Sequence, residues 1–108
     1  MFARMVSLVT LPAKQAELTD IIERKVAPLI NRRKGFVDYL TLISDAEPRL
    51  VVAISIWRDR ESAESFGNET APTIYEYLKP LLQDEPQIRT FECFSIHSHK
   101  AKKATTRA

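Results

Sequence analysis

The fold is set by the stretch GFVDYLTLISDAEPRLVVAISIWRDRESAESF, which spans Gly35–Phe66. Its β-branched and aromatic runs predict one strand over Phe36–Ser44 and a second over Leu50–Trp57. The Asp-Ala-Glu-Pro segment at residues 45–48 is typical of a turn between them. A short helix is expected over Arg60–Phe66. The stretch is therefore a predicted hairpin that runs directly into a helix.

Helix boundaries support this interpretation. Asp59 is a suitable N-cap for the short helix, and Gly67 is a suitable stop just beyond it. Upstream, a long amphipathic helix ends in a cationic turn followed by Gly35. Pro28 lies inside that helix and cannot donate a backbone hydrogen bond, so we expect a kink there. Its apolar stripe consists of Leu18, Ile21, Ile22, Val26, Leu29 and Ile30.

The two ends of the chain complete the pattern. A strand is predicted over Phe2–Val9 and another over Ile88–His97, on either side of the elements above. A further helix is expected to begin near Pro72 and to bend at Pro80. Its predicted buried stripe consists of Ile74, Tyr77, Leu78, Leu81 and Leu82. The order βαββαβ indicates an α+β, ferredoxin-like domain with a four-stranded antiparallel sheet.

The predicted strands are apolar on both faces. Val51–Trp57 contains large apolar side chains at both odd and even positions, and Phe36–Ile43 does so as well. An exposed face of an antiparallel sheet normally alternates apolar with polar residues. Two helices can cover only one face of a four-stranded sheet. We therefore expect a homodimer packed through the sheet faces, with an interface of at least ~1,200 Å².

Length and charge restrict the class of protein. At 108 residues the chain is one domain, expected over residues 1–98, with a basic and disordered tail over residues 99–108. Residues 100–108 hold four of the sixteen Lys and Arg side chains, which leaves twelve against fourteen acids in residues 1–99. The body has no basic face, so no nucleic-acid partner is expected. Nor do we expect a membrane partner, because no apolar run is long enough for a span.

The single cysteine, Cys93, excludes an intramolecular disulfide and disfavours a thiolate metal cluster. His97 and His99 stand two residues apart without a neighbouring carboxylate or thiol, which makes a weak metal site. We expect no metal and a cytoplasmic location.

The combination of Gly35-Phe36, the Ile-Ser-Ile-Trp ending of residues 54–57, the acidic helix that follows and the segment Pro86–Glu92 resembles the antibiotic-biosynthesis-monooxygenase-like (ABM) domains. These belong to the dimeric α/β-barrel superfamily, and the resemblance covers roughly residues 2–97. It implies a dimeric α/β barrel with one pocket per subunit, between the helices and the sheet. It also implies that Trp57 borders this pocket.

The resemblance covers several activities. Some such domains are oxygenases that act on polycyclic phenols without a cofactor, and the substrate itself supplies the electrons. Others degrade haem or oxidise quinols. The haem-degrading relatives use an asparagine on the first strand and a histidine on the helix after the tryptophan. This chain has no asparagine before Asn31 and no histidine between Trp57 and His97. We therefore expect no haem and no other cofactor.

Five residues are candidates for ligand contact. Trp57 could stack on a flat ligand, or it could fill the gap between sheet and helices as a core residue. Tyr39, Phe66 and Tyr75 are the other aromatic candidates, whereas Tyr77 is expected in the core. His97 could act as a general base if it faces the pocket, or it could be a solvated residue at a strand end.

Charged residues interrupt the apolar strands. These residues are Arg4, Asp38, Arg89 and Glu92. A charge on a buried sheet face should be paired, because an isolated one is costly. Arg4 and Glu92 have matching parity on strands that this fold makes neighbours, so we expect a cross-strand pair at the dimer interface. The alternative is that an arginine in the pocket steers an anionic substrate.

The sequence thus favours a small cofactor-independent monooxygenase that acts on an aromatic or quinol-type compound. The reaction would proceed by base-assisted formation of an anion, stacking on Trp57 and addition of dioxygen in a dry cavity. The catalytic base is not identified by the sequence. Two alternatives remain: a dimer that binds an apolar aromatic metabolite without turnover, and a structural dimer with a filled core.

Overall fold

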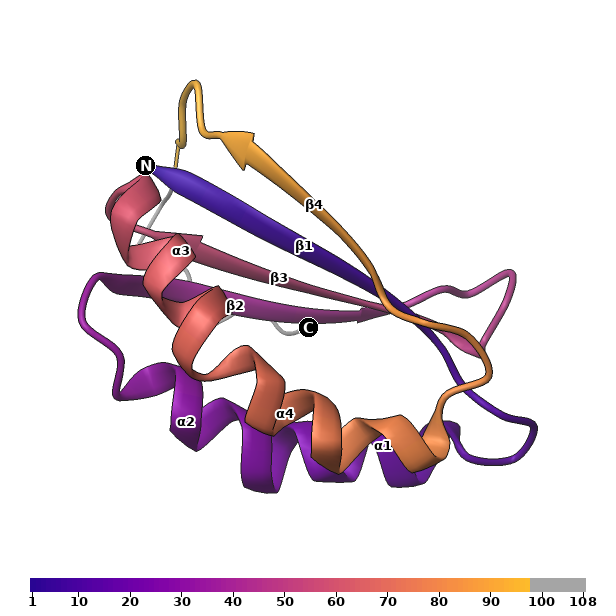
Figure 1. Cartoon of the computed structure of the whole chain (residues 1–108). Helices are drawn as coiled ribbons and strands as arrows, with labels where there is room; N and C mark the ends of the chain where they lie inside the picture. The colour runs from indigo at the N-terminus through magenta and orange to yellow at the C-terminus, as the bar shows by residue number, and fades with distance from the viewer. Residues whose placement is uncertain (98–108) are drawn as a thin grey trace.

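A computed structural model describes residues 1–97 and gives the element order predicted from the sequence. The strands are β1 (Phe2–Val9), β2 (Phe36–Ile43), β3 (Leu50–Trp57) and β4 (Gln87–Glu92). They form one antiparallel sheet in the order β2-β3-β1-β4, with the helices layered on one side of it (Figure 1). The α+β, ferredoxin-like βαββαβ architecture is confirmed.

The first helical region is divided by a π-helical turn. Helix α1 (Gln15–Ile21) leads into the π-helical turn over Ile22–Val26, and α2 (Ala27–Asn31) follows. The sequence predicted a distortion here because Pro28 cannot donate to the carbonyl of Arg24. A π turn that ends two residues before Pro28 is the form that this distortion takes, since the wider turn changes the hydrogen-bond partner of each residue.

The second helical region differs from its prediction at Gly67. Helix α3 (Arg60–Glu69) continues through this glycine, and α4 (Ala71–Leu78) starts after Thr70. The Asp59 side chain caps α3 as predicted, accepting a hydrogen bond of 2.8 Å from the Ser62 backbone N–H. A 3-10 turn over Lys79–Leu81, which contains Pro80, ends this region.

Strand β4 is shorter than predicted. Pairing between β1 and β4 ends at Phe2 opposite Glu92, and one further hydrogen bond of 2.8 Å joins the Cys93 N–H to the Met1 carbonyl. Within the described residues, strand β4 ends at Glu92, so the ladder stops before His97. The predicted tail at residues 99–108 lies outside the described residues.

The core lies between the helices and one face of the sheet. Strand β1 contributes Phe2 and Leu8, and β3 contributes Val51 and Trp57. The helices contribute Leu18, Ile22, Val26, Ile30, Ala63, Phe66, Ile74, Leu78 and Leu81. Within residues 1–97, no helix combines the length and the apolar character needed to cross a bilayer.

The opposite face of the sheet is also apolar and is not covered by residues 1–97. Strand register places Leu40, Ile54 and Met5 in one row on this face, with Leu42 and Val52 in the next. Leu40 and Leu42 are each 45% exposed. This is the apolar face from which the sequence predicted dimerisation.

Candidate functional site

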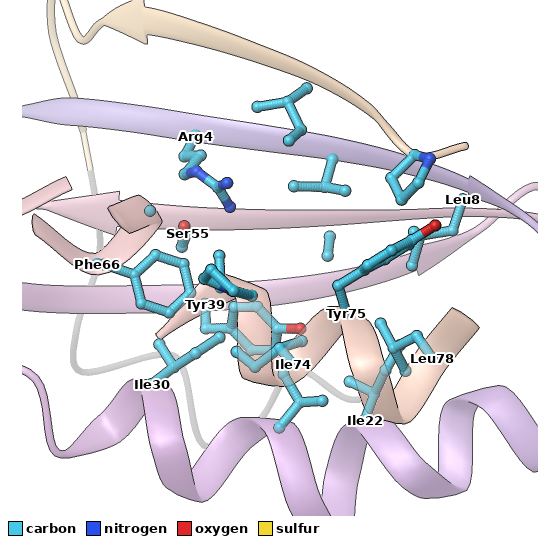
Figure 2. A pocket seen from close by; sticks show the side chains of 18 of the residues that line it. Arg4, Leu8, Ile22, Ile30, Tyr39, Ser55, Phe66, Ile74, Tyr75 and Leu78 are labelled. Atoms are coloured by element: carbon cyan, nitrogen blue, oxygen red, sulfur yellow. The ribbon is translucent and has the colours of Figure 1, made fainter. Parts of the chain in front are cut away.

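A cavity of about 350 Å³ lies between the sheet and the helices (Figure 2). Its wall is mostly aliphatic and aromatic, with side chains from all four strands, the π turn, α2 and the region α3–α4. The apolar lining consists of Val6, Leu8, Ile22, Val26, Ile30, Ala53, Phe66, Ala71, Pro72, Ile74, Leu78, Pro86 and Ile88. A volume of this size and chemistry suits a small apolar molecule.

The cavity exists because β3 carries small residues at its centre. Residues of β3 that face the helices are Val51, Ala53, Ser55 and Trp57, since side chains alternate along a strand. Trp57 fills the space at one end, whereas Ala53 and Ser55 leave room beside it. The order of large and small side chains along the inner face of β3 therefore creates two regions. We call the region around Trp57 the packed end and the region beside Ala53 and Ser55 the hollow middle.

A row of polar side chains crosses the sheet at one end of the cavity. Tyr39 lies opposite Ser55, Ser55 lies opposite Arg4, and Arg4 lies opposite Thr90. The first three line the cavity, and Figure 2 shows them near one another beside Phe66. We call Tyr39, Ser55 and Arg4 the polar row.

Arg4 does not form the predicted pair with Glu92. Glu92 lies two positions away, opposite Phe2, and its carboxylate is 3.6 Å from Arg60. The parity of the prediction was right, but both residues lie on the helix side of the sheet and the register separates them. The Arg4 guanidinium instead lies 5.3 Å from the centre of the Phe66 ring. Burial lowers the pKa of Arg4, because a desolvated site disfavours the charged form.

Trp57 lies in the core rather than in the cavity wall. It is 0% exposed, stacks on Phe66 with 4.9 Å between ring centroids, and meets Phe36 edge to face at 5.9 Å. Its indole N–H donates a 2.9 Å hydrogen bond to Ser55 Oγ. Because Phe66 separates it from the cavity, Trp57 acts on the site only by supporting Phe66 and orienting Ser55.

Of the three tyrosines, only Tyr77 departs from its prediction, because it does not lie in the core. Tyr39 and Tyr75 line the cavity, whereas Tyr77 is 40% exposed and lies under the ammonium group of Lys25. Burial raises the pKa of Tyr39, so its phenol remains a hydrogen-bond donor. The Tyr75 hydroxyl lies 3.3 Å from a carboxylate oxygen of Glu85 and donates to it.

His97 is exposed and follows the end of β4, outside the cavity wall. The titratable side chains of the wall are Arg4, Tyr39, Tyr75 and Glu85. Sequence reasoning missed Glu85 and Ser55. A signal existed for Ser55, a small polar residue at an inward position of an apolar strand. Glu85 gave none, because it precedes β4 in a segment whose path only the tertiary fold defines.

Comparisons with known proteins agree with the geometry. Residues 1–71 match the family model described as antibiotic biosynthesis monooxygenase. The fold resembles a putative antibiotic biosynthesis monooxygenase from Nitrosomonas europaea, with a TM-score of 0.75 and 14% identity over 88% of this chain and 100% of that one.

A second similar structure is a monooxygenase from the gene ActVA-Orf6 of Streptomyces coelicolor, in complex with the ligand nanaomycin D. It has a TM-score of 0.76 and 18% identity over 91% of both chains. A putative antibiotic biosynthesis monooxygenase from Deinococcus radiodurans has a TM-score of 0.76 and 16% identity over 92% of this chain and 98% of that one. No curated protein sequence matches. The match over residues 1–71 extends across about two thirds of the 108 residues, and on this ground the chain belongs to the antibiotic biosynthesis monooxygenase family.

Proposed function

We propose that the protein is a monooxygenase that oxidises a flat aromatic or quinol-type compound in this cavity without a bound cofactor. The observation that carries the proposal is the cavity itself, which has a volume of about 350 Å³ and is walled mostly by aliphatic and aromatic side chains. Family membership supports the same reaction class. The similar structure from Streptomyces coelicolor is a complex with the ligand nanaomycin D, which supports a small-molecule ligand for this fold.

The chemistry requires the substrate to act as its own reductant. An activated ring CH₂ group loses a proton to give an enolate, the enolate carbon forms a bond to dioxygen, and the O–O bond breaks as a C=O group forms. One oxygen atom remains in the product and the other leaves as water, so CH₂ + O₂ gives C=O + H₂O. An apolar wall favours this sequence, because it excludes water that would quench the intermediates.

We assign ligand contact to Tyr39, Phe66 and Tyr75, all of which line the cavity. Trp57 is a positioning residue in this assignment, since it lies behind Phe66 and holds Ser55 by a 2.9 Å hydrogen bond. Glu85 is the carboxylate of the wall and accepts from Tyr75. It is therefore the group placed to receive a proton through the Tyr75 hydroxyl.

Oxygen uptake tests the proposal. Anthrone, a tricyclic ketone with one activated CH₂ group, should be converted to anthraquinone with one dioxygen consumed per product. Labelled dioxygen should leave one heavy atom in the product. Ala53→Leu should abolish turnover, because the larger side chain fills the cavity at its centre. The matched control is Ala16→Leu, the same change at an exposed position of α1.

Binding without turnover is a second candidate function, because the described cavity wall contains no histidine and its one carboxylate is already engaged with Tyr75. Saturable binding of anthrone to wild type, lost in Ala53→Leu, with no oxygen uptake would establish this candidate instead. If anthrone neither binds nor reacts, the cavity is not a site for polycyclic aromatics.

The protein is further proposed to function as a homodimer through the outer sheet face. Leu40, Leu42 and Phe91 are 45–47% exposed on this face, and neighbouring exposed apolar side chains of this kind are typical of an interaction surface. Ile54→Lys puts a charge at the centre of the same face. Light scattering after size exclusion should give twice the chain mass for wild type and a shift toward the chain mass for the variant. A monomeric wild type would contradict this assignment.

A further inference from the structure

Arg4 has no acidic partner within residues 1–97. No carboxylate of the described chain lies within ion-pairing distance of its guanidinium, although Arg24, Arg33 and Arg60 each have one. Glu64 and Arg4 both line a second pocket but form no ion pair with each other. The contact with the Phe66 ring compensates only part of the desolvation that the guanidinium undergoes. Arg4 is therefore a partly desolvated cation at the cavity wall that no carboxylate of residues 1–97 neutralises.

Ser55 contributes a hydrogen-bond donor beside Arg4. The Ser55 oxygen already accepts the Trp57 indole N–H at 2.9 Å. An indole nitrogen can only donate, so the Ser55 hydroxyl hydrogen cannot bond to it and is free to donate to another acceptor. Register places Ser55 directly opposite Arg4 on the neighbouring strand. Because Ser55 Oγ accepts from Trp57, the Ser55 hydroxyl hydrogen is available to donate at the cavity wall.

Tyr39 completes the row. It lies opposite Ser55 on β2, and burial raises the pKa of its phenol, which also interacts with the Thr41 side chain. The polar row therefore offers a guanidinium and two hydroxyl donors, and no carboxylate is within it. The carboxylate of the wall, Glu85, precedes β4 near the other end of β1 and is engaged by Tyr75. The cavity is electrically polarised, with its positive end at the polar row and its negative end at Glu85.

We propose that the polar row is an oxyanion-binding site, so that the cavity selects apolar ring compounds carrying one anionic oxygen group, held by Arg4 with Ser55 and Tyr39. This assignment uses the cavity of the proposed function and adds the ligand's charge and its orientation. A phenolate, an enolate and a carboxylate share the chemistry that the row recognises. The apolar remainder of the ligand then extends toward Ile22 and Leu78, as the labelled side chains in Figure 2 indicate.

The test compares binding of matched anionic and neutral ligands by isothermal titration calorimetry at neutral pH. The carboxylate pair is 2-naphthoate and 2-naphthamide. The phenolate pair is 2,4-dinitro-1-naphthol, which is ionised at neutral pH, and its methyl ether. Wild type should prefer the anion of at least one pair by about tenfold or more, the range of a charge-assisted hydrogen bond. Comparison of the two pairs distinguishes a carboxylate site from a phenolate site.

Variants locate the preference. Arg4→Met should reduce the anion preference to about onefold while the affinity for the neutral partner changes by less than about threefold, because the apolar wall is kept. Arg4→Lys should retain part of the preference. Arg60→Met is the matched control, since Arg60 also lies over a phenylalanine ring, at 4.7 Å, but outside the cavity. It should keep the wild-type preference.

The outcomes separate this inference from the proposed function, because none of these ligands carries the activated CH₂ group that anthrone offers. Equal affinity for anionic and neutral partners in wild type would overturn the oxyanion site and leave the oxygenase proposal standing. A preference that survives in Arg4→Met would also overturn it. If no probe binds, the oxyanion site is overturned as well. If Arg4→Met does not fold, as judged by circular dichroism, Arg4→Gln takes its place with the same expectation. An anion preference without oxygen uptake from anthrone would overturn only the oxygenase proposal.

Discussion

Two neighbouring regions of the interface between sheet and helices differ sharply. At the packed end, Trp57 is enclosed by Phe36 and Phe66 and is fully buried. In the hollow middle, Ala53 and Ser55 of the same strand leave a cavity of about 350 Å³. Both regions share the same strands and the same helical layer. The difference therefore comes from side-chain volume at alternate positions of β3.

The two regions differ in their contribution: the packed end stabilises the fold, whereas the hollow middle provides space for a ligand. Well-packed aromatic side chains provide a large share of core stabilisation. A cavity gives up such contacts, which costs free energy of folding. The two regions are linked by the hydrogen bond from Trp57 to Ser55, through which the packed end orients a side chain of the hollow middle.

The strongest way to break the comparison is to open the packed end. Trp57→Ala should lower the free energy of unfolding by about 3–5 kcal/mol, because it removes the largest fully buried side chain. Urea denaturation followed by circular dichroism at fixed protein concentration measures this. Tyr77→Ala, an aromatic truncation at a 40% exposed position, should cost less than about 1 kcal/mol. Equal costs for the two variants would show that the packed end has no special role in stability.

The two glycines of the chain give a matched test, one in each region. Gly35 has φ +86°, and an added Cβ would overlap the Ser62 side chain. Gly35→Ala should therefore cost about 2–4 kcal/mol, from the disfavoured backbone conformation and the overlap. Gly67 is helical, and an added Cβ would meet Arg4 Nε at 3.6 Å, an ordinary contact distance. Gly67→Ala should raise stability by up to about 1 kcal/mol. Thermal denaturation of both variants checks the opposite signs.

Breaking the link between the regions should have a smaller effect. Ser55→Ala leaves the buried Trp57 indole N–H without its acceptor, which should cost about 1–2 kcal/mol in urea denaturation. The emission of Trp57, the single tryptophan, reports the change of environment directly. Ser7→Ala, the same change on the outer face of the sheet, should be nearly neutral. An unchanged stability in Ser55→Ala would mean that the hydrogen bond does not hold the two regions together.

The smallest effect concerns the protonation of Tyr39 in the hollow middle. Burial raises its pKa above the ordinary value of 10.0, because the phenolate is poorly solvated there. Its contribution to stability is fully present below that ordinary value and is lost as the pH rises through the higher folded value. Tyrosinate absorbance is measured against pH for wild type and Tyr39→Phe. The difference between the two titrations should show one tyrosine, Tyr39, that ionises above the ordinary tyrosine pKa. If Tyr39 instead ionised at the ordinary pKa of tyrosine, water would have to solvate its phenolate in the cavity.

Prediction from the sequence succeeded where a local period carried the signal. Strand alternation and the helical stripe gave the element order, and the absence of polar alternation indicated a second apolar sheet face. Prediction failed where the same residue spacing is compatible with two different arrangements of the side chains. Tyr75 and Tyr77 flank the buried row of α4 from opposite sides, so periodicity cannot tell which one faces the cavity. The Arg4–Glu92 pair failed for a related reason, since parity fixes the face of the sheet but not the register.

By itself, the sequence determined the α+β architecture, the Asp59 cap, the need for glycine at residue 35 and the family, because each depends on residues close together in the chain or on a repeating pattern. Only the tertiary structure decided that Trp57 is a core residue, that Arg4 faces a cavity, and that Tyr39, Ser55 and Arg4 form one row. Those relations depend on the register between strands distant in sequence and on how side-chain volumes fill the space beneath the helices. Neither the strand register nor this packing can be predicted from a repeating pattern within one segment of the sequence.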